Sequence, residues 1–149
     1  RCILDAGGPV LRLGAEAGPF LLKPNLAELE QALGAQLRTL RAIRDAALIF
    51  LRKGASHVVV SMGAMGAMYV SEARTLYAPA LRVEARSTVG AGDAMVGGML
   101  LGLQKSGDMA QAFRYGIAAG AASVMTEGTQ LIHPEDFERL VSQVKVQEV

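Results

Sequence analysis

The stretch "RSTVGAGDAMVGG", residues 86–98, sets Gly90, Ala91 and Gly92 directly before Asp93, at the expected start of an apolar helix. Small side chains leave several backbone N–H groups free to point at one spot, and a helix N-terminus adds a partial positive charge there. Such a loop suits a phosphoryl group, and a carboxylate beside it can accept a proton from an attacking hydroxyl. On spacing alone, a glycine turn in which Asp93 caps the helix explains the stretch equally well.

Strand-like and helix-like segments alternate on both sides of this stretch. Apolar and β-branched runs predict strands at 2–6, 19–25, 57–63, 67–71 and 75–81. Helical spacing and capping residues predict helices at about 9–16, 25–34, 37–53, 93–105, 109–126 and 134–145. We therefore expect one α/β domain over residues 1–149, with a mostly parallel sheet, helices on both of its faces and sites at the carboxyl ends of its strands.

The composition excludes several classes of protein. The 149 residues are 51% hydrophobic and 19% charged, which is typical of a folded globular domain. A net charge of +1 and the lack of a basic run argue against nucleic acid, and the charge-free runs are too short and glycine-rich for a membrane span. Cys2 is the only cysteine, so no internal disulfide can form, and a reducing cytoplasm is the expected location.

A second motif, "KPNLAELE" at residues 23–30, follows a predicted strand. Asn25 and Glu28 stand three residues apart at a helix start, which is the spacing of a capping box. The same residues allow another interpretation, in which Glu28 holds a Mg²⁺-bound water and Lys23 lies near phosphate. The two interpretations are compatible.

Glycines mark two further places. "SMGAMGA", residues 61–67, follows a predicted strand, and Gly63 and Gly66 either form a turn or let a ligand lie close to the backbone. On the two helices that follow Asp93, glycines recur four residues apart. Close helix packing is the simpler explanation, and a flat base lying against the second helix is the alternative. These glycines are Gly98, Gly102, Gly116 and Gly120.

Taken together and in this order, the motifs resemble the phosphofructokinase B (ribokinase-like) family of sugar kinases. The residues that carry the resemblance are "KPNLAELE", "VVVSMGAMGA", "STVGAGDAMVGG" and "GIAAGAASVMTEGT", which span most of the chain. "STV" at residues 87–89 resembles the branch of phosphofructokinases, 1-phosphofructokinases and tagatose-6-phosphate kinases. The resemblance implies a ribokinase-like fold and transfer of a phosphoryl group from ATP to a sugar phosphate.

The resemblance also implies roles for individual residues. Asp93 is then the catalytic base, and Gly90, Ala91 and Gly92 build the anion hole. Glu28 then holds Mg²⁺ through a water molecule. The residues that bind ATP are Lys23, Asn25, Ser61, Gly63, Gly66, Ile117 and Ala121. A monovalent cation such as K⁺ would bind at Ser87, Val89, Ser123, Thr126 and Gly128. At this cation site the chain departs from the family, because Gln130 stands where related phosphofructokinases often have arginine.

The resemblance covers only part of a family member. Members carry an N-terminal half with sugar-binding residues and a β-sheet lid, whereas this chain opens at Arg1 on a strand. We therefore interpret it as the C-terminal, ATP-binding part of a kinase, nearly inactive alone, whose homodimer would form through the absent lid. Two alternatives stay open: a nucleotide-binding module without chemistry, and a ribokinase- or adenosine kinase-like enzyme with another acceptor.

Overall fold

The computed structural model describes residues 1–149 and divides into two compact units. The first unit comprises Arg1–Met62, Ala67–Tyr77 and Glu148–Val149, and the second comprises Gly63–Gly66 and Ala78–Gln147. This division was not predicted, because no linker or change of composition separates the two units.

A six-stranded sheet follows the order of the sequence. Its strands are β1 (Ile3–Leu4), β2 (Leu21–Leu22), β3 (His57–Ser61), β4 (Ala67–Val70), β5 (Thr75–Ala78) and β6 (Gln147–Glu148). The pairs β1–β2 and β2–β3 are parallel, while β4 runs antiparallel to β3, so the sheet is mixed. The α/β class is confirmed. The two N-terminal strands are shorter than predicted, and β6 was missed because its polar two-residue segment lacks a strand pattern.

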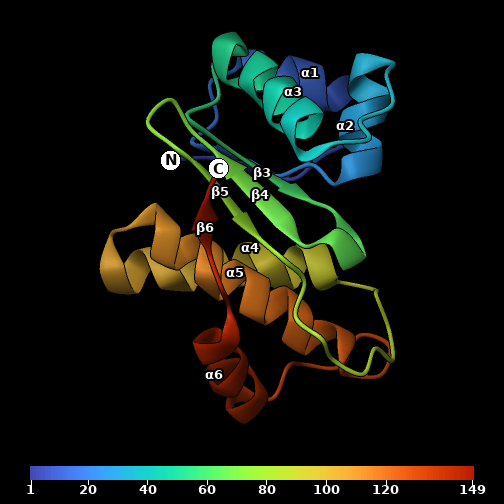
Figure 1. Ribbon diagram of the computed structural model, residues 1–149, viewed down its shortest axis with the longest axis vertical. Helices are drawn as coiled ribbons and strands as arrows, with labels where there is room; N and C mark the ends of the chain where they lie inside the picture. Colours follow the sequence, from blue (N-terminus) through green and yellow to red (C-terminus); the bar gives the residue numbers. More distant parts are fainter. The chain divides into compact units, whose positions relative to one another are not determined.

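Three helices accompany the strands of the first unit: α1 (Gly8–Glu16), α2 (Leu26–Leu33) and α3 (Leu40–Lys53). They lie together on one side of β3 and β4 (Figure 1). The core beneath them includes Leu11, Leu29, Phe50 and Val58, all fully buried. The continuous apolar run of β3 is thus buried, as expected for an inner strand.

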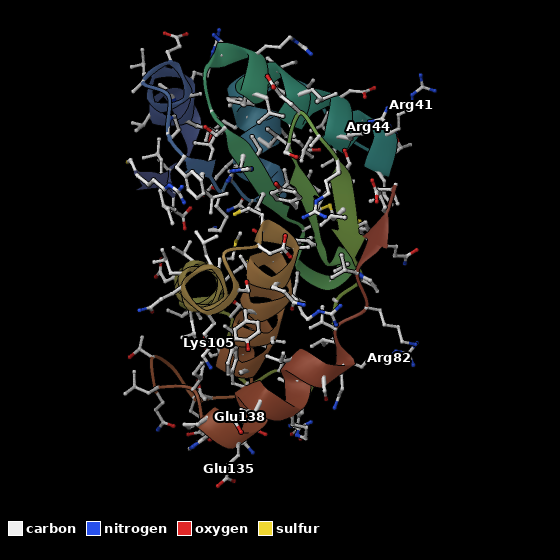
Figure 2. The ribbon with its side chains drawn as sticks, turned by 90° about the vertical axis from the view of Figure 1, so that its left-hand side faces the viewer. Arg41, Arg44, Arg82, Lys105, Glu135 and Glu138 are labelled. Carbon is white, nitrogen blue, oxygen red and sulfur yellow. The ribbon has the colours of Figure 1, made fainter.

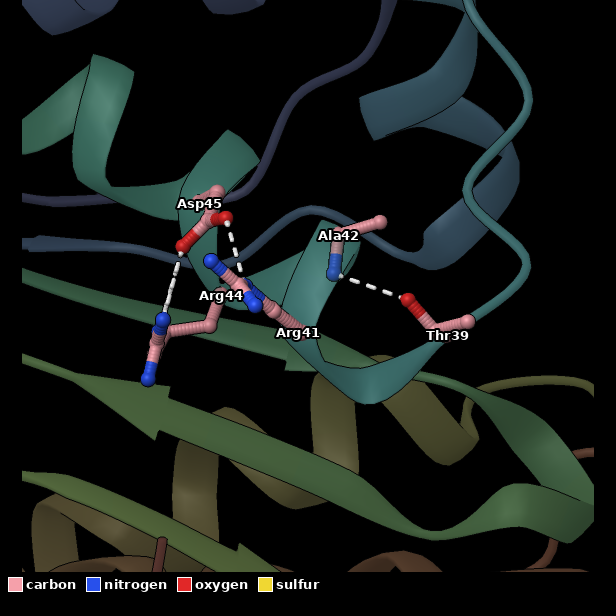
Figure 3. Close-up of polar contacts among 5 residues, drawn as sticks. All are labelled: Thr39, Arg41, Ala42, Arg44 and Asp45. Carbon is pink, nitrogen blue, oxygen red and sulfur yellow. Dashed lines mark hydrogen bonds and ion pairs between the residues drawn. The ribbon is translucent and has the colours of Figure 1, made fainter.

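The start of α3 differs from the prediction. The Thr39 hydroxyl accepts a hydrogen bond from the backbone N–H of Ala42 at 3.1 Å, so the helix begins at Leu40 and not at Leu37 (Figure 3). The N–H of Leu37 instead donates to Glu30 Oε1 at 2.7 Å. A threonine cap decides the helix start here, while apolar spacing only marks the buried face.

The outward face of α3 is charged. Arg41 and Arg44 point away from the helix in Figure 2, and both pair with Asp45 in Figure 3. Asp45 lies 3.0 Å from Arg44 and 3.9 Å from Arg41, and all three side chains are more than a third exposed. Exposed pairs of this kind add little stability.

His57, at the start of β3, is a half-buried titratable group. Its Nδ1 lies 2.9 Å from the Tyr69 hydroxyl, and its ring packs edge-on against Phe20. Burial lowers the pKa of His57, and the charge of Arg1 lowers it further. The folded state therefore favours the neutral ring, so the unfolded chain binds the proton more tightly.

We expect the free energy of unfolding to fall as the pH is lowered from about 6.5, the usual pKa of histidine, through the lowered folded pKa of His57. Urea unfolding between about pH 7.5 and 5.5 measures this trend. His57→Gln should reduce this dependence of the unfolding free energy on pH. His133→Gln, at an exposed helix start, should leave the dependence unchanged. An equal slope in wild type and His57→Gln would contradict the assignment.

The second unit contains α4 (Ala91–Ser106), α5 (Met109–Val124) and α6 (Pro134–Gln143). Helices α4 and α5 pack closely, and α6 lies near α5 (Figure 1). A Cβ atom added at Gly98 would stand 2.6 Å from the Tyr115 carbonyl oxygen, and one at Gly116 would stand 2.5 Å from Met99. Close helix packing therefore explains these glycines. The exposed charged side chains of this unit include Lys105, Glu135 and Glu138 (Figure 2).

No helix in the structure combines the length and the apolar character that a membrane crossing requires.

Candidate active site

The loop at residues 90–93 forms the first turn of α4. The helix begins at Ala91, two residues earlier than predicted, and its N-cap is Gly90 with φ +78° and ψ 0°. This left-handed conformation favours glycine over any residue with a Cβ atom. Asp93 is the third helical residue and makes no capping hydrogen bond. The interpretation of Asp93 as the helix cap is therefore wrong, and its exposed carboxylate is left without an intrachain partner.

Two of the backbone donors at this turn are free. The N–H of Ala94 donates to the Gly90 carbonyl at 2.8 Å, and that of Ala91 makes only a long contact of 3.4 Å with Thr88. The N–H groups of Gly92 and Asp93 have no acceptor in the chain. Unpaired amides at a helix N-terminus form an anion site, so this turn has the donors that a phosphate group requires.

Asp93 borders a cavity of about 520 Å³ within the second unit. Most of the lining atoms are apolar, and Asp93 is the only lining residue with a formal charge. The lining residues are Val89, Gly90, Asp93, Ala94, Gly97, Gly98, Leu101, Ala119, Ser123, Thr129, Gln130, Leu131, Ile132 and Phe137. The carboxylate thus stands at the edge of a largely apolar hollow, where it can meet a group that enters beside the free amides.

The motif at residues 23–30 lies at the carboxyl ends of strands in the first unit. Glu28 N–H donates to Asn25 Oδ1, and Asn25 N–H donates to Glu28 Oε2, both at 2.8 Å, which confirms the capping box. Asn25 also bridges to Ser61 beside the end of β3. The structure therefore brings Asn25, Glu28 and Ser61 together, and Glu28 keeps one carboxylate oxygen free of hydrogen bonds.

Lys23 is buried, with 4% of its side chain exposed. Its Nζ lies 3.0 Å from Asp5 Oδ2, and Asp5 follows β1 just as Lys23 follows β2. A buried ammonium requires such a partner. The sequence does not predict this ion pair, because Asp5 and Lys23 are eighteen positions apart; the place of Asp5 directly after an apolar strand is the only signal.

The two glycines of the loop after β3 differ. Gly63 begins a single 3₁₀ turn (Gly63–Met65), has φ +56° and faces open space, so a ligand can approach it. Gly66 has φ +89° and is buried against the backbone of residues 78–80, where a Cβ atom would overlap the Ala78 carbonyl oxygen. The chain itself therefore explains why Gly66 is a glycine.

Ile117 and Ala121 lie one turn apart on α5. Ile117 is 8% exposed, and Ala121 is half-buried. Ala119 and Ser123, which line the cavity beside Asp93, project from a different side of the same helix. The predicted adenine contacts thus share a face, and it is separate from the face that borders this cavity.

The residues predicted for a monovalent cation come from two segments that the structure joins. The N–H groups of Arg86 and Ser87 donate to the Val124 carbonyl at 2.7 and 3.2 Å, which holds the 86–89 segment against the end of α5. Thr126 Oγ1 donates to the carbonyls of Ser123 and Gln130 at 2.9 and 3.2 Å. Gly128, with φ +58°, shapes the turn between them. Ser87 and Val89 thus lie near Ser123, Thr126 and Gly128.

Comparison with known proteins places this geometry among carbohydrate kinases. Residues 3–136 match the model of the pfkB family of carbohydrate kinases. A 1-phosphofructokinase of Rhodobacter capsulatus is 38% identical over 146 residues, which are 98% of this chain and 46% of that protein. The chain spans about half the length of the curated relatives it matches.

Solved structures agree with this match. Phosphofructokinase-2 from Escherichia coli in complex with potassium superposes with a TM-score of 0.88 and 35% identity, over 96% of this chain and 47% of that one. A ribokinase from Thermotoga maritima superposes with a TM-score of 0.72 and 28% identity, over 83% of this chain and 42% of that one. The chain therefore shares a ribokinase-like fold and covers less than half of each of these two structures.

Proposed function

The chain belongs to the pfkB family of carbohydrate kinases, and from this premise we propose that the complete protein transfers a phosphoryl group from ATP to a hydroxyl of a sugar phosphate. Asp93 accepts the proton of the attacking hydroxyl, and the amides of the 90–93 loop hold the transferred group. Fructose 6-phosphate, fructose 1-phosphate and tagatose 6-phosphate are the candidate acceptors. Relatives named phosphofructokinases support this class of acceptor.

One observation carries the proposal. In the first turn of α4, a carboxylate without a partner and two amides without acceptors occur within two residues of each other. A structural cap would use its carboxylate on the helix, as Asn25 uses its amide oxygen in α2. The same turn therefore offers a base and an anion site, the two groups that phosphoryl transfer to an alcohol requires.

The residues fit ATP and Mg²⁺ by their chemistry. Lys23 supplies a positive charge for phosphate, and the free oxygen of Glu28 is a ligand of the type that Mg²⁺ takes directly or through water. When bound, the metal neutralises phosphate charge. Asn25 and Ser61 complete the part of the nucleotide site that lies in the first unit. In the second unit, Gly63 is open to a ligand and Gly66 keeps its loop in place.

A monovalent cation belongs to the same proposal. The turn from Ser123 to Gly128 and the segment at Ser87–Val89 present backbone carbonyl and hydroxyl oxygens, which are suitable ligands for K⁺. The potassium complex of the E. coli relative supports this site. Removing K⁺ from the complete protein and measuring MgATP affinity tests it.

The reaction is tested by incubating the complete protein with MgATP and each candidate sugar phosphate. We expect ADP release with at least one of them and almost none from residues 1–149 alone, because most acceptor contacts would be missing. ATP binding without turnover on any sugar phosphate or free sugar would instead favour a nucleotide-binding module. The cytoplasmic location and a homodimer are parts of the same proposal.

The adenine contact is tested by Ala121→Trp. The indole would fill the face of α5 that Ile117 and Ala121 share, so we expect ATP affinity to fall by more than about tenfold, or 1.4 kcal/mol. Isothermal titration calorimetry on the complete protein measures the affinity. Gln111→Trp, at an exposed position on the first turn of α5, is the matched control and should bind normally. A folded Ala121→Trp variant with unchanged affinity would rule out this pocket.

A further inference from the structure

The loop after β1, residues 5–7, faces the motif at 23–30 within the first unit. Strands β1 and β2 pair in parallel, with Leu4 opposite Leu22, so the chain leaves both strands at the same edge. The Lys23 N–H donates to the Leu4 carbonyl at 2.9 Å, which continues the pairing by one residue. Asp5 and Lys23 are therefore neighbours by strand register.

Asp5 holds the Lys23 side chain. The two groups are 3.0 Å apart, and the lysine side chain is 4% exposed whereas that of Asp5 is 32% exposed. Asp5 is the only anionic partner of this buried ammonium. Removing one member of a buried pair leaves the other charge uncompensated, so the ammonium would lose its position without Asp5. The ammonium has three donors, and the pair leaves others for an incoming anion.

Gly7 gives room to Glu28. Its φ of −118° and ψ of 173° suit any residue, so backbone conformation does not require glycine there. A Cβ atom at this position would lie 2.8 Å from Cγ and 3.2 Å from Cδ of Glu28. A methyl group would therefore push the Glu28 side chain aside. Glu28 is fixed from its other side by the hydrogen bond from Asn25.

We propose that Asp5 and Gly7 are positioning residues for nucleotide binding: Asp5 fixes the cation of Lys23, and Gly7 leaves the space in which the carboxylate of Glu28 lies. The inference rests on the proposed function, which gives Lys23 and Glu28 to phosphate and Mg²⁺. The loop at residues 5–7 thereby sets the geometry of both side chains. Residues of this kind commonly alter affinity by about 10–100-fold when replaced.

Asp5→Asn is the first test, in the complete protein. We expect MgATP affinity, measured by calorimetry, to fall about 10–100-fold, while Asp45→Asn, in an exposed ion pair of α3, leaves it unchanged. When Asp5→Asn is added to Lys23→Met, we expect no further loss of MgATP affinity, because Asp5 acts through Lys23. A loss of thermal stability with unchanged affinity would reduce the pair to a structural role and overturn the proposal.

Gly7→Ala is the second test. We expect the Mg²⁺ concentration for half-maximal ATP binding to rise about 10–100-fold, with no further rise when Gly7→Ala is added to Glu28→Gln. Melting temperatures of each variant, measured in parallel, identify any that fail to fold. If Lys23→Met and Glu28→Gln leave MgATP binding intact, the proposed nucleotide site is wrong. If these two weaken binding but Asp5→Asn and Gly7→Ala do not, the positioning roles are wrong.

Discussion

Asp93→Asn in the complete protein should lower kcat by about 10²–10⁴-fold, the usual loss when a general base is removed. The amide cannot accept the proton of the sugar hydroxyl. MgATP binding should change little, because the free amides of Gly92 and Asp93 are backbone groups that the replacement keeps. Steady-state kinetics with the active sugar phosphate and calorimetry with ATP separate the two effects.

Stability distinguishes this role from a structural one. Asp93 makes no capping hydrogen bond, so the replacement removes only its favourable interaction with the helix dipole, about 0.3–1 kcal/mol. Thr39→Ala is the opposite control: Thr39 caps α3, and its loss should cost about 1 kcal/mol of stability without slowing turnover. A stable Asp93→Asn variant that turns over at the wild-type rate would remove Asp93 from the chemistry.

Local signals in the sequence predicted much of the fold. The spacing of Asn25 and Glu28 predicted a capping box that the structure confirms, and the predicted ends of α2 and α3 lie at the C-caps Gly34 and Gly54. The start of α3 was misplaced because apolar spacing outweighed Thr39, a capping residue visible in the sequence. Signals of this kind act over a few residues, so they locate elements well and their boundaries less well.

The site was harder to predict where it depends on distant contacts. The loop at 90–93 was predicted as a candidate site, but the role of Gly90 as N-cap was not predicted, since glycine is a weaker capping signal than aspartate. The ion pair of Lys23 with Asp5 depends on the parallel pairing of β1 and β2. The room that Gly7 leaves for Glu28 depends on how the β1–α1 loop lies against α2. No periodicity or short motif encodes such contacts.

The glycines of α4 provide a stability test within one helix. Gly97 and Gly98 are adjacent, yet a Cβ atom at Gly97 would meet nothing within 4 Å, whereas one at Gly98 would stand 2.5 Å from Cβ of Ala119. The Tyr115 carbonyl oxygen, only 2.6 Å from that position, belongs to the backbone of α5 and cannot rotate away. A methyl group at residue 98 therefore forces the two helices apart.

Gly98→Ala should consequently lower the free energy of unfolding by about 1–3 kcal/mol, the usual range for overpacking. Gly97→Ala should raise it by about 0.5–1 kcal/mol, because alanine favours a helix over glycine. Urea unfolding of the complete protein, at matched m-values, measures both changes. Since the variants differ by one position and carry the same methyl group, composition and helix propensity cancel between them. Opposite signs can then arise only from the contact between α4 and α5, and equal changes would mean that the helices do not pack at Gly98.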